Sequence, residues 1–229
     1  MDTKYLFYVT LMISIIVQVI TGIIDLSAYF VKVPTAYSII RQLLVIEIVV
    51  QFFEGVFYVW LAYNFTHALN ITPKRYVDWA ITTPSMLLTL MMYLIYLKEK
   101  GKGMDTSNLK VSTLLKENAS IFVPVLGLNW LMLLFGYLGE MKKIPVLLGV
   151  FLGFIPFLIY YYLIYVNFVT EEDTNGYLLF WYFFFFWSLY GVVAVLPYYV
   201  KNAFYNILDL FAKNFFGIFL SYLIISGNF

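Results

Sequence analysis

The sequence predicts an all-α membrane protein that folds as a bundle of seven transmembrane helices. Its 229 residues are 63% hydrophobic and only 12% charged. Apolar stretches of about 20 residues or more recur along the chain, and a helix of that length crosses a hydrocarbon core of about 30 Å. The connections between these stretches are short and polar. They leave no room for a soluble domain, so residues 1–229 are expected to form a single membrane domain.

Polar segments separate the seven predicted spans. The first two spans are divided at Lys32–Thr35, and the second ends before Asn70–Lys74. Glu140–Lys143 divides the fourth span from the fifth, and Glu171–Gly176 divides the fifth from the sixth. The predicted spans are Tyr5–Phe30, Tyr37–Tyr63, Tyr76–Leu97, Leu114–Leu138, Ile144–Val169, Tyr177–Tyr199 and Ala203–Ile225.

The orientation in the membrane follows from the basic residues. Seven spans place the two termini on opposite sides. Of the 14 Lys and Arg residues, Lys213 lies inside a span, seven lie on the side of the C-terminus and six on the side of the N-terminus. The seven are Lys32, Arg41, Lys98, Lys100, Lys102, Lys110 and Lys116; the six are Lys4, Lys74, Arg75, Lys142, Lys143 and Lys201. The positive-inside rule therefore favours an extracellular N-terminus and a cytoplasmic C-terminus.

Composition also excludes several function classes. The net charge is +1 and no basic stripe stands outside the spans, so membrane lipid rather than nucleic acid is the expected partner. There is no cysteine, which excludes disulfides and thiol catalysis. The sequence carries no metal-ligand cluster, phosphate-binding glycine loop or hydrolytic triad. A conventional enzyme is not expected.

Lys213 is the most informative residue. It lies near the middle of the last apolar stretch, four residues after Asp209. A charge inside the membrane costs several kcal/mol and is by default a functional group, whereas a lysine that only reaches for water would lie near a helix end. The spacing of Lys213 and Asp209 places both on one helix face, where each reduces the cost of burying the other. This pair suits a buried, protonated Schiff base with its counterion.

The third span carries a second cluster of polar and aromatic residues. Asp78 and Thr82 share one face, with Arg75 a turn before them. An adjacent face, able to hold a flat apolar ligand, carries Trp79, Thr83 and Met86. Pro84 lies inside the span, which membrane helices tolerate where a neighbour satisfies the freed carbonyl.

These motifs resemble those of the microbial (type I) rhodopsins. In that family the third helix reads Arg, aromatic, small, Asp, Trp and then Thr-Thr-Pro, and the seventh reads Asp, three residues, Lys. Here these are Arg75, Asp78-Trp79, Thr82-Thr83-Pro84, and Asp209 with Lys213. Trp187-Ser188-Leu189-Tyr190 resembles the sixth-helix aromatic motif, and Phe135–Glu140 is similar to the end of the fourth helix of proteorhodopsins.

The resemblance implies a cofactor and roles for individual residues. Lys213 would bind all-trans retinal as a Schiff base, with Asp78 and Asp209 as counterions, Asp78 as proton acceptor and Arg75 on their extracellular side. The residues implied to bind the retinal are Trp79, Thr82, Thr83, Met86, Met132, Gly136, Trp187 and Tyr190.

Three departures from the family bear on the kind of rhodopsin. Outward proton pumps usually carry a carboxylate eleven residues after the Asp78 equivalent, to reprotonate the Schiff base, and here that place holds Thr89. Gly191 stands where a proline commonly follows the sixth-helix tyrosine. The extracellular carboxylates that release protons in some pumps also lack obvious counterparts. Fast vectorial proton transfer is therefore poorly supported.

Four spans carry polar stripes at helical spacing, which suggests a hydrated route between the first, second, third and seventh helices. The stripes are Ser14, Gln18, Thr21 and Asp25; Glu47, Gln51, Glu54 and Tyr58; Asp78, Thr82, Ser85 and Thr89; and Asn202, Asn206, Asp209 and Lys213. The alternative is that they are interhelical hydrogen bonds worth about 1 kcal/mol each. That explanation suits scattered Ser and Thr but not Glu47 and Glu54, which need water or a cation around them.

Two local matches favour a channel. The run Ile46–Glu54 resembles the second helix of channelrhodopsins, and Asp209–Asn214 is similar to their seventh helix, including the asparagine after the lysine. The compact chain looks like the viral rhodopsins of group 1, which implies a light-gated cation channel. The implied ions are monovalent or divalent cations or protons. Members of the family form several kinds of homo-oligomer. The implied pathway and gate residues are Glu47, Glu54, Asn202, Asn206 and Asn214. A light-driven outward proton pump and a sensory rhodopsin are the alternatives.

Three minor sites complete the sequence analysis. Asn129 is expected to form a structural hydrogen bond with Thr83. His67 is expected to be an interfacial residue at the end of the second helix. The acidic residues Glu171, Glu172 and Asp173 are expected to form a solvated loop.

Overall fold

The computed structural model describes residues 2–66, 70–171 and 173–229, and within these the chain is helical and has no strand. The expectations for His67 and Glu172 fall outside the described residues. The helices are α1 (Thr3–Tyr29), α2 (Ser38–Asn64), α3 (Thr72–Gly101), α4 (Val111–Glu117), α5 (Ala119–Glu140), α6 (Val146–Phe168), α7 (Thr174–Val193), α8 (Tyr198–Asp209) and α9 (Phe215–Ser226). A short 3-10 helix, Thr35–Tyr37, precedes α2, and a π-helical turn, Leu210–Asn214, joins α8 to α9.

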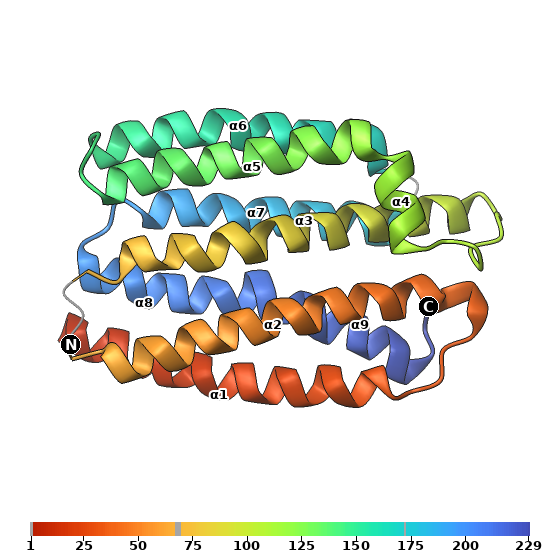
Figure 1. Ribbon diagram of the computed structural model, residues 1–229, viewed down its shortest axis with the longest axis horizontal. Coiled ribbons are helices and arrows are strands. Elements are labelled where there is room, and N and C mark those ends of the chain that lie inside the picture. Colours follow the sequence, from red (N-terminus) through yellow and green to blue (C-terminus); the bar gives the residue numbers. More distant parts are fainter. Residues whose placement is uncertain (1, 67–69, 172) are drawn as a thin grey trace.

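The predicted seven-helix bundle is confirmed. Seven helical segments among the described residues are long and apolar enough to cross a membrane, the last of them being Tyr198–Ser226, which contains α8, the π turn and α9. The helices run side by side along the long axis of the molecule, with α5 and α6 packed together at one side and α1 at the other (Figure 1). The N-terminus and the C-terminus lie at opposite ends of the bundle, as seven crossings require (Figure 1).

The fourth span begins later than its hydrophobicity predicts. Leu114 belongs to the separate short helix α4, and the spanning helix α5 starts at Ala119. Asn118 divides the two helices, because its backbone leaves the helical region and its side chain donates a hydrogen bond to the Leu114 carbonyl (3.1 Å). An asparagine that bonds to the preceding turn competes with helix continuation, so the apolar run from Leu114 onward is interrupted.

The boundary between the sixth and seventh spans is also displaced from its prediction. The sixth span ends at Val193 rather than Tyr199, and α8 begins at Tyr198 rather than Ala203. Pro197 is the N-cap residue of α8, and proline lacks the N–H that a continuing helix needs. Asn202 therefore lies inside the last span, one turn from its start.

The third span, α3, is the centre of the bundle. In the most apolar 18-residue stretch of α3, 72% of the residues are buried inside the protein, whereas in the corresponding stretch of α5 only 22% are buried. Pro84 cannot donate to the carbonyl of Ala80, and the Trp130 indole on α5 donates to that oxygen instead (2.9 Å). The expectation that a neighbour satisfies the freed carbonyl is confirmed, and the bond ties α3 to α5.

Close packing of α5 on α6 depends on Gly149. A Cβ at this position would lie 2.7 Å from the backbone oxygen of Phe135. Only glycine permits so close an approach of two helix backbones. The α5 and α6 pair thus forms a tight outer wall for the space next to α3.

Candidate functional site

The buried amine of Lys213 lies among three carboxylates from three helices. Its Nζ donates a hydrogen bond to Asp78 Oδ2 at 2.6 Å. Glu54 Oε1 lies 3.6 Å away and Asp209 Oδ1 3.8 Å away. All four side chains are almost completely inaccessible to solvent. A buried charge of this kind is tolerated only when paired, and Asp78 is the group in direct contact.

The π turn changes the relation between Lys213 and Asp209. The sequence prediction assumed a regular α-helix, in which residues four apart lie on one face. Lys213 instead lies in the π turn Leu210–Asn214, which begins directly after Asp209. Of the two predicted counterions, Asp78 on α3 makes the shorter contact with Nζ and Asp209 the longer one.

Asp209 is held mainly by two tyrosines and by Arg75. Tyr190 donates to its Oδ1 at 2.6 Å and Tyr58 to its Oδ2 at 2.7 Å. Arg75 Nη1 lies 3.4 Å from the same Oδ2 and is 0% exposed. Charge-assisted hydrogen bonds such as these hold a carboxylate firmly. The sequence placed Tyr58 in a polar stripe without identifying it as a partner of Asp209.

Two asparagines of α8, predicted as pathway residues, hold Arg75. Its Nε donates to Asn202 Oδ1 at 3.0 Å, and its Nη2 donates to Asn206 Oδ1 and to the Asn202 backbone oxygen (3.3 Å). Asn202 also donates to Thr72 Oγ1 at 3.0 Å. The predicted counterion group and the predicted pathway therefore meet at one arginine.

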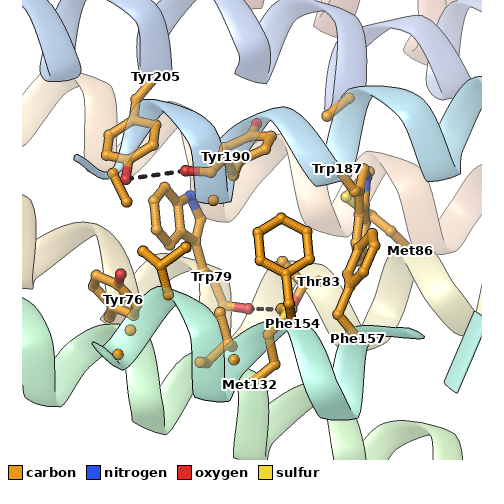
Figure 2. A pocket seen from close by; sticks show the side chains of 18 of the residues that line it. Tyr76, Trp79, Thr83, Met86, Met132, Phe154, Phe157, Trp187, Tyr190 and Tyr205 are labelled. Carbon is orange, nitrogen blue, oxygen red and sulfur yellow. Dashed lines mark hydrogen bonds between the residues drawn. The ribbon is translucent and has the colours of Figure 1, made fainter. Parts of the chain in front are cut away.

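An apolar pocket extends from Lys213 between α3, α5, α6 and α7. Figure 2 shows aromatic side chains from α3, α6 and α7 gathered around a common space, with Met132 of α5 beside them. Eight of the residues predicted for the cofactor line it: Trp79, Thr83, Met86, Met132, Gly136, Trp187, Tyr190 and Lys213. Thr82 does not line the pocket. It is buried and donates to the Asp78 backbone oxygen (3.0 Å), so it belongs with the charged face of α3.

The sequence did not identify the α6 wall of the pocket. Gly153, Phe154 and Phe157 line it from this helix, and Tyr76, Leu133 and Tyr205 add to the lining from α3, α5 and α8. Two glycines shape the walls, because a Cβ at Gly136 would lie 2.6 Å from the Tyr76 hydroxyl and one at Gly191 would lie 2.5 Å from the Phe154 ring. The only available signal was the small and aromatic spacing of Gly149, Gly153 and Phe157.

The polar residues of α1 are joined to the last span by hydrogen bonds. Ser14 donates to the Asn206 backbone oxygen (3.1 Å), and Gln18 Nε2 donates to Asn214 Oδ1 (3.3 Å). Asn214 Nδ2 donates to Thr21 Oγ1 (3.1 Å). We call Ser14, Gln18, Thr21 and Asp25 the α1 polar face. Most of its contacts are the interhelical bonds that the alternative interpretation expected.

The corresponding residues of α2 differ. Glu47, Gln51 and Glu54, which we call the α2 polar face, are buried. Among the described residues, five buried polar atoms of this face have no hydrogen-bond partner. They are both carboxylate oxygens of Glu54, both polar atoms of the Gln51 amide, and Oε1 of Glu47. Buried polar groups are normally paired, and leaving one unpaired costs about 1–3 kcal/mol. Glu54 Oε1 has one ion pair, at 3.6 Å from Lys213 Nζ, and hydrogen bonds do not explain the burial of the rest of the α2 polar face.

Two further polar contacts lie outside this region. Asn129 Nδ2 donates to Thr83 Oγ1 at 2.8 Å, which confirms the predicted structural bond. Lys201 Nζ and Glu140 Oε1 form a buried ion pair at 2.6 Å between α8 and α5. From the sequence both residues were expected at exposed ends of connections, so this pair was not predicted.

Comparisons with known proteins agree with the seven-helix fold. The family model described as bacteriorhodopsin-like protein matches residues 9–227. The crystal structure of the viral rhodopsin OLPVRII is similar to the chain, with 30% sequence identity, 99% of each chain covered and a TM-score of 0.79. No curated protein matches the chain.

More distant solved structures share the fold. The blue light-absorbing proteorhodopsin from Med12 is 17% identical, covers 98% of both chains and has a TM-score of 0.72. Xanthorhodopsin, described as a light-driven ion pump with dual chromophore, is 17% identical and covers 98% of this chain and 94% of its own, with a TM-score of 0.75.

Proposed function

Since the chain belongs to the family of bacteriorhodopsin-like proteins, which bind retinal, we propose that it is a light-gated cation channel. The family comprises photoreceptors, pumps and channels, so membership alone leaves the transport mode open. The choice depends on the α2 polar face and its relation to Lys213. We propose no enzymatic activity.

The pocket suits retinal bound to Lys213. It is lined by flat aromatic and thioether side chains, and it ends at the only amine in its wall among the described residues. We propose that all-trans retinal is bound there as a Schiff base, with Trp79, Thr83, Met86, Met132, Gly136, Trp187 and Tyr190 around it. When bound, retinal supplies light absorption and a light-driven isomerisation.

The residues around Nζ of Lys213 have distinct roles in this proposal. Asp78, at 2.6 Å, is the nearest counterion and accepts the proton from Nζ. Asp209 is a second counterion, but two tyrosines and Arg75 hold it in place, so it favours the charged state of the site without moving. When the proton moves from Nζ to Asp78, the attraction between Lys213 and its neighbours falls and the network can rearrange.

The α2 polar face is the observation that carries the channel proposal. Three carboxylates and two cations meet at the site: Glu54, Asp78 and Asp209 against Arg75 and Lys213. Gln51 and Glu47 continue from Glu54 along α2, at intervals of three and four residues. Polar side chains in this setting favour a hydrated route, and carboxylates along it favour cations over anions.

The asparagines of the last span supply the closing contacts of the route. Asn202 and Asn206 hold Arg75 at one end, and Asn214 bridges Gln18 and Thr21 in the middle. We propose that these bonds break when the Lys213 turn moves, so that cations then pass between α1, α2, α3 and the last span. Monovalent and divalent cations and protons are the candidate ions.

The placement in the membrane is part of the proposal. Residues 1–229 form one integral multi-pass domain in lipid, with an extracellular N-terminus and a cytoplasmic C-terminus. Arg75 then lies in the extracellular half. Homo-oligomers are compatible with the exposed apolar surfaces of the outer helices.

A light-driven outward proton pump is the second candidate. The contact between Lys213 Nζ and Asp78 favours it, because a direct acceptor is in place for the first proton transfer. Thr89, buried on α3, donates to the Ser85 backbone oxygen and has no ionisable proton at neutral pH. Return of a proton from the other side would therefore be slow.

Light-evoked current under voltage clamp tests the proposal. Cells supplied with retinal are illuminated while the holding potential and the external cation are varied. A channel gives a current whose reversal potential follows the cation gradient. A current that remains outward at every potential would contradict the channel and identify a pump.

A further inference from the structure

Asp25, the last member of the α1 polar face, is unlike the others because it is a carboxylate. It lies in the half of the bundle away from Arg75 and is completely buried. Ser221 on α9 donates to its Oδ1 at 2.7 Å. Its Oδ2 has no hydrogen-bond partner within the part of the chain that the structure describes. A neutral side chain would join α1 to α9 at a lower cost in desolvation.

The carboxylate lies directly on the backbone of α9. A Cβ at Gly217 would be 2.5 Å from Asp25 Oδ2 and 3.2 Å from Cγ. Such a contact is far below the normal separation of non-bonded atoms, so glycine is needed at this position. Gly217 and Ser221 together form a seat for the Asp25 carboxylate.

This seat is connected to the retinal lysine through the helix. Lys213, Gly217 and Ser221 follow one another at intervals of four residues across the π turn and α9. A displacement of the π turn would therefore move Gly217 and Ser221, the two residues that hold Asp25. A helix is stiff enough over two turns to carry such a movement.

Helix α2, which packs against α1, carries a second buried carboxylate, Glu47. Among the described residues no lysine or arginine forms an ion pair with Asp25 or Glu47. Two buried carboxylates without a basic partner are costly in a resting structure, and they are suited to a place through which a cation passes.

We propose that Asp25 is a latch that closes the pathway at the end away from Arg75. In the dark its carboxylate is seated on Gly217 and Ser221 and holds α1 against α9. Movement of the Lys213 turn withdraws that seat, and Asp25 then turns toward Glu47, where the two carboxylates line an open exit for cations. The role in conduction rests on the proposed channel function, whereas the light-driven release of Asp25 does not.

Two variants weaken the latch by different means. Gly217→Ala inserts a methyl group where Oδ2 lies, and Ser221→Ala removes the hydrogen bond without adding bulk. Gly55→Ala is the matched control, because a Cβ there meets nothing within 4 Å. An unchanged visible absorption band shows that each variant is folded and holds retinal.

Infrared difference spectroscopy, light minus dark, tests the release of Asp25. We expect carboxyl or carboxylate bands that disappear in Asp25→Asn and that are reduced in Gly217→Ala and Ser221→Ala but not in Gly55→Ala. In voltage-clamped cells we expect the photocurrent of the two latch variants to decay about tenfold more slowly after illumination. A factor of this size corresponds to the loss of a hydrogen bond to a charged group.

The outcomes separate the two proposals. If the Asp25 bands are present but no passive current exists, the latch stands and the channel function fails. If passive currents exist but no difference band belongs to Asp25, and closing is the same in Gly217→Ala as in Gly55→Ala, the latch is wrong and the channel function stands.

Discussion

The polar faces of α1 and α2 carry similar residues at the same spacing, yet their surroundings are different. Ser14, Gln18 and Thr21 on α1 are hydrogen-bonded to α8 and the π turn. Glu47, Gln51 and Glu54 on α2 are equally buried, and within the described residues most of their polar atoms accept or donate no hydrogen bond. The α1 face holds the bundle together, and the α2 face is suited to water and ions. Spacing alone does not distinguish the two roles.

The two faces meet at Lys213, and its removal tests the comparison most severely. Glu54 of the α2 face lies 3.6 Å from Nζ, and Asn214, which holds the α1 face, is the next residue in the chain. We expect Lys213→Ala to abolish the visible absorption band of retinal-supplied protein completely, and the photocurrent with it. Absorption spectroscopy of the purified variant is the measurement. A retained visible band would reject Lys213 as the attachment site.

Glu47→Gln separates the two faces by function. It removes a charge from the α2 face, so we expect at least a severalfold smaller photocurrent or an altered cation selectivity. The visible spectrum should not move, since among the described residues Glu47 has no ion pair with Lys213. Voltage clamp with Na⁺ and K⁺ exchanged outside gives both quantities. Thr21→Val on the α1 face is the control, and equal effects of the two variants would remove the distinction.

Spectral shifts locate the point where the α2 face approaches the chromophore. Loss of a negative charge near a protonated Schiff base shifts absorption to the red, and the shift falls with distance. We therefore expect a large red shift in Asp78→Asn, whose oxygen is 2.6 Å from Nζ, and a smaller one in Glu54→Gln at 3.6 Å. An unshifted band in Asp78→Asn would reject Asp78 as a counterion and leave that role to Asp209 and Glu54.

The smallest expected effect concerns the stability of the α1 face. Thr21→Val removes the hydroxyl that accepts from Asn214 and conserves the volume. Interhelical hydrogen bonds in membranes contribute about 0.6–1 kcal/mol each. We expect a slightly lower temperature of thermal bleaching and unchanged ion selectivity, measured by following visible absorption on heating. A change of selectivity would assign Thr21 to the pathway.

Much of the fold and of the pocket was predictable from the sequence, because both depend on local patterns. The lengths of the apolar stretches predicted the seven spans, and the motif of α3 predicted that Asp78, Trp79 and Thr83 lie beside Lys213. Hydrophobicity did not predict the helix boundaries at Asn118 and Pro197, since each boundary depends on one residue inside an apolar run.

Contacts between distant helices were beyond a single sequence. The buried pair Lys201 and Glu140 lies between α8 and α5, and Gly217 receives a carboxylate from α1. No local pattern in the sequence predicted the π turn at Lys213. The approach of Glu54 to Lys213 likewise appeared only once α2 was placed against the last span.

Light-dependent modification of Gln51→Cys tests the central claim most directly, that the α2 face borders a hydrated pathway. The chain has no cysteine, so the introduced thiol is the only target for a charged, water-soluble thiol reagent. We predict that the reagent reacts much faster under illumination than in the dark and reduces the photocurrent, whereas Ser14→Cys on the hydrogen-bonded α1 face reacts slowly in both conditions. Equal rates at Gln51→Cys in light and dark, with an unchanged photocurrent, would contradict the account.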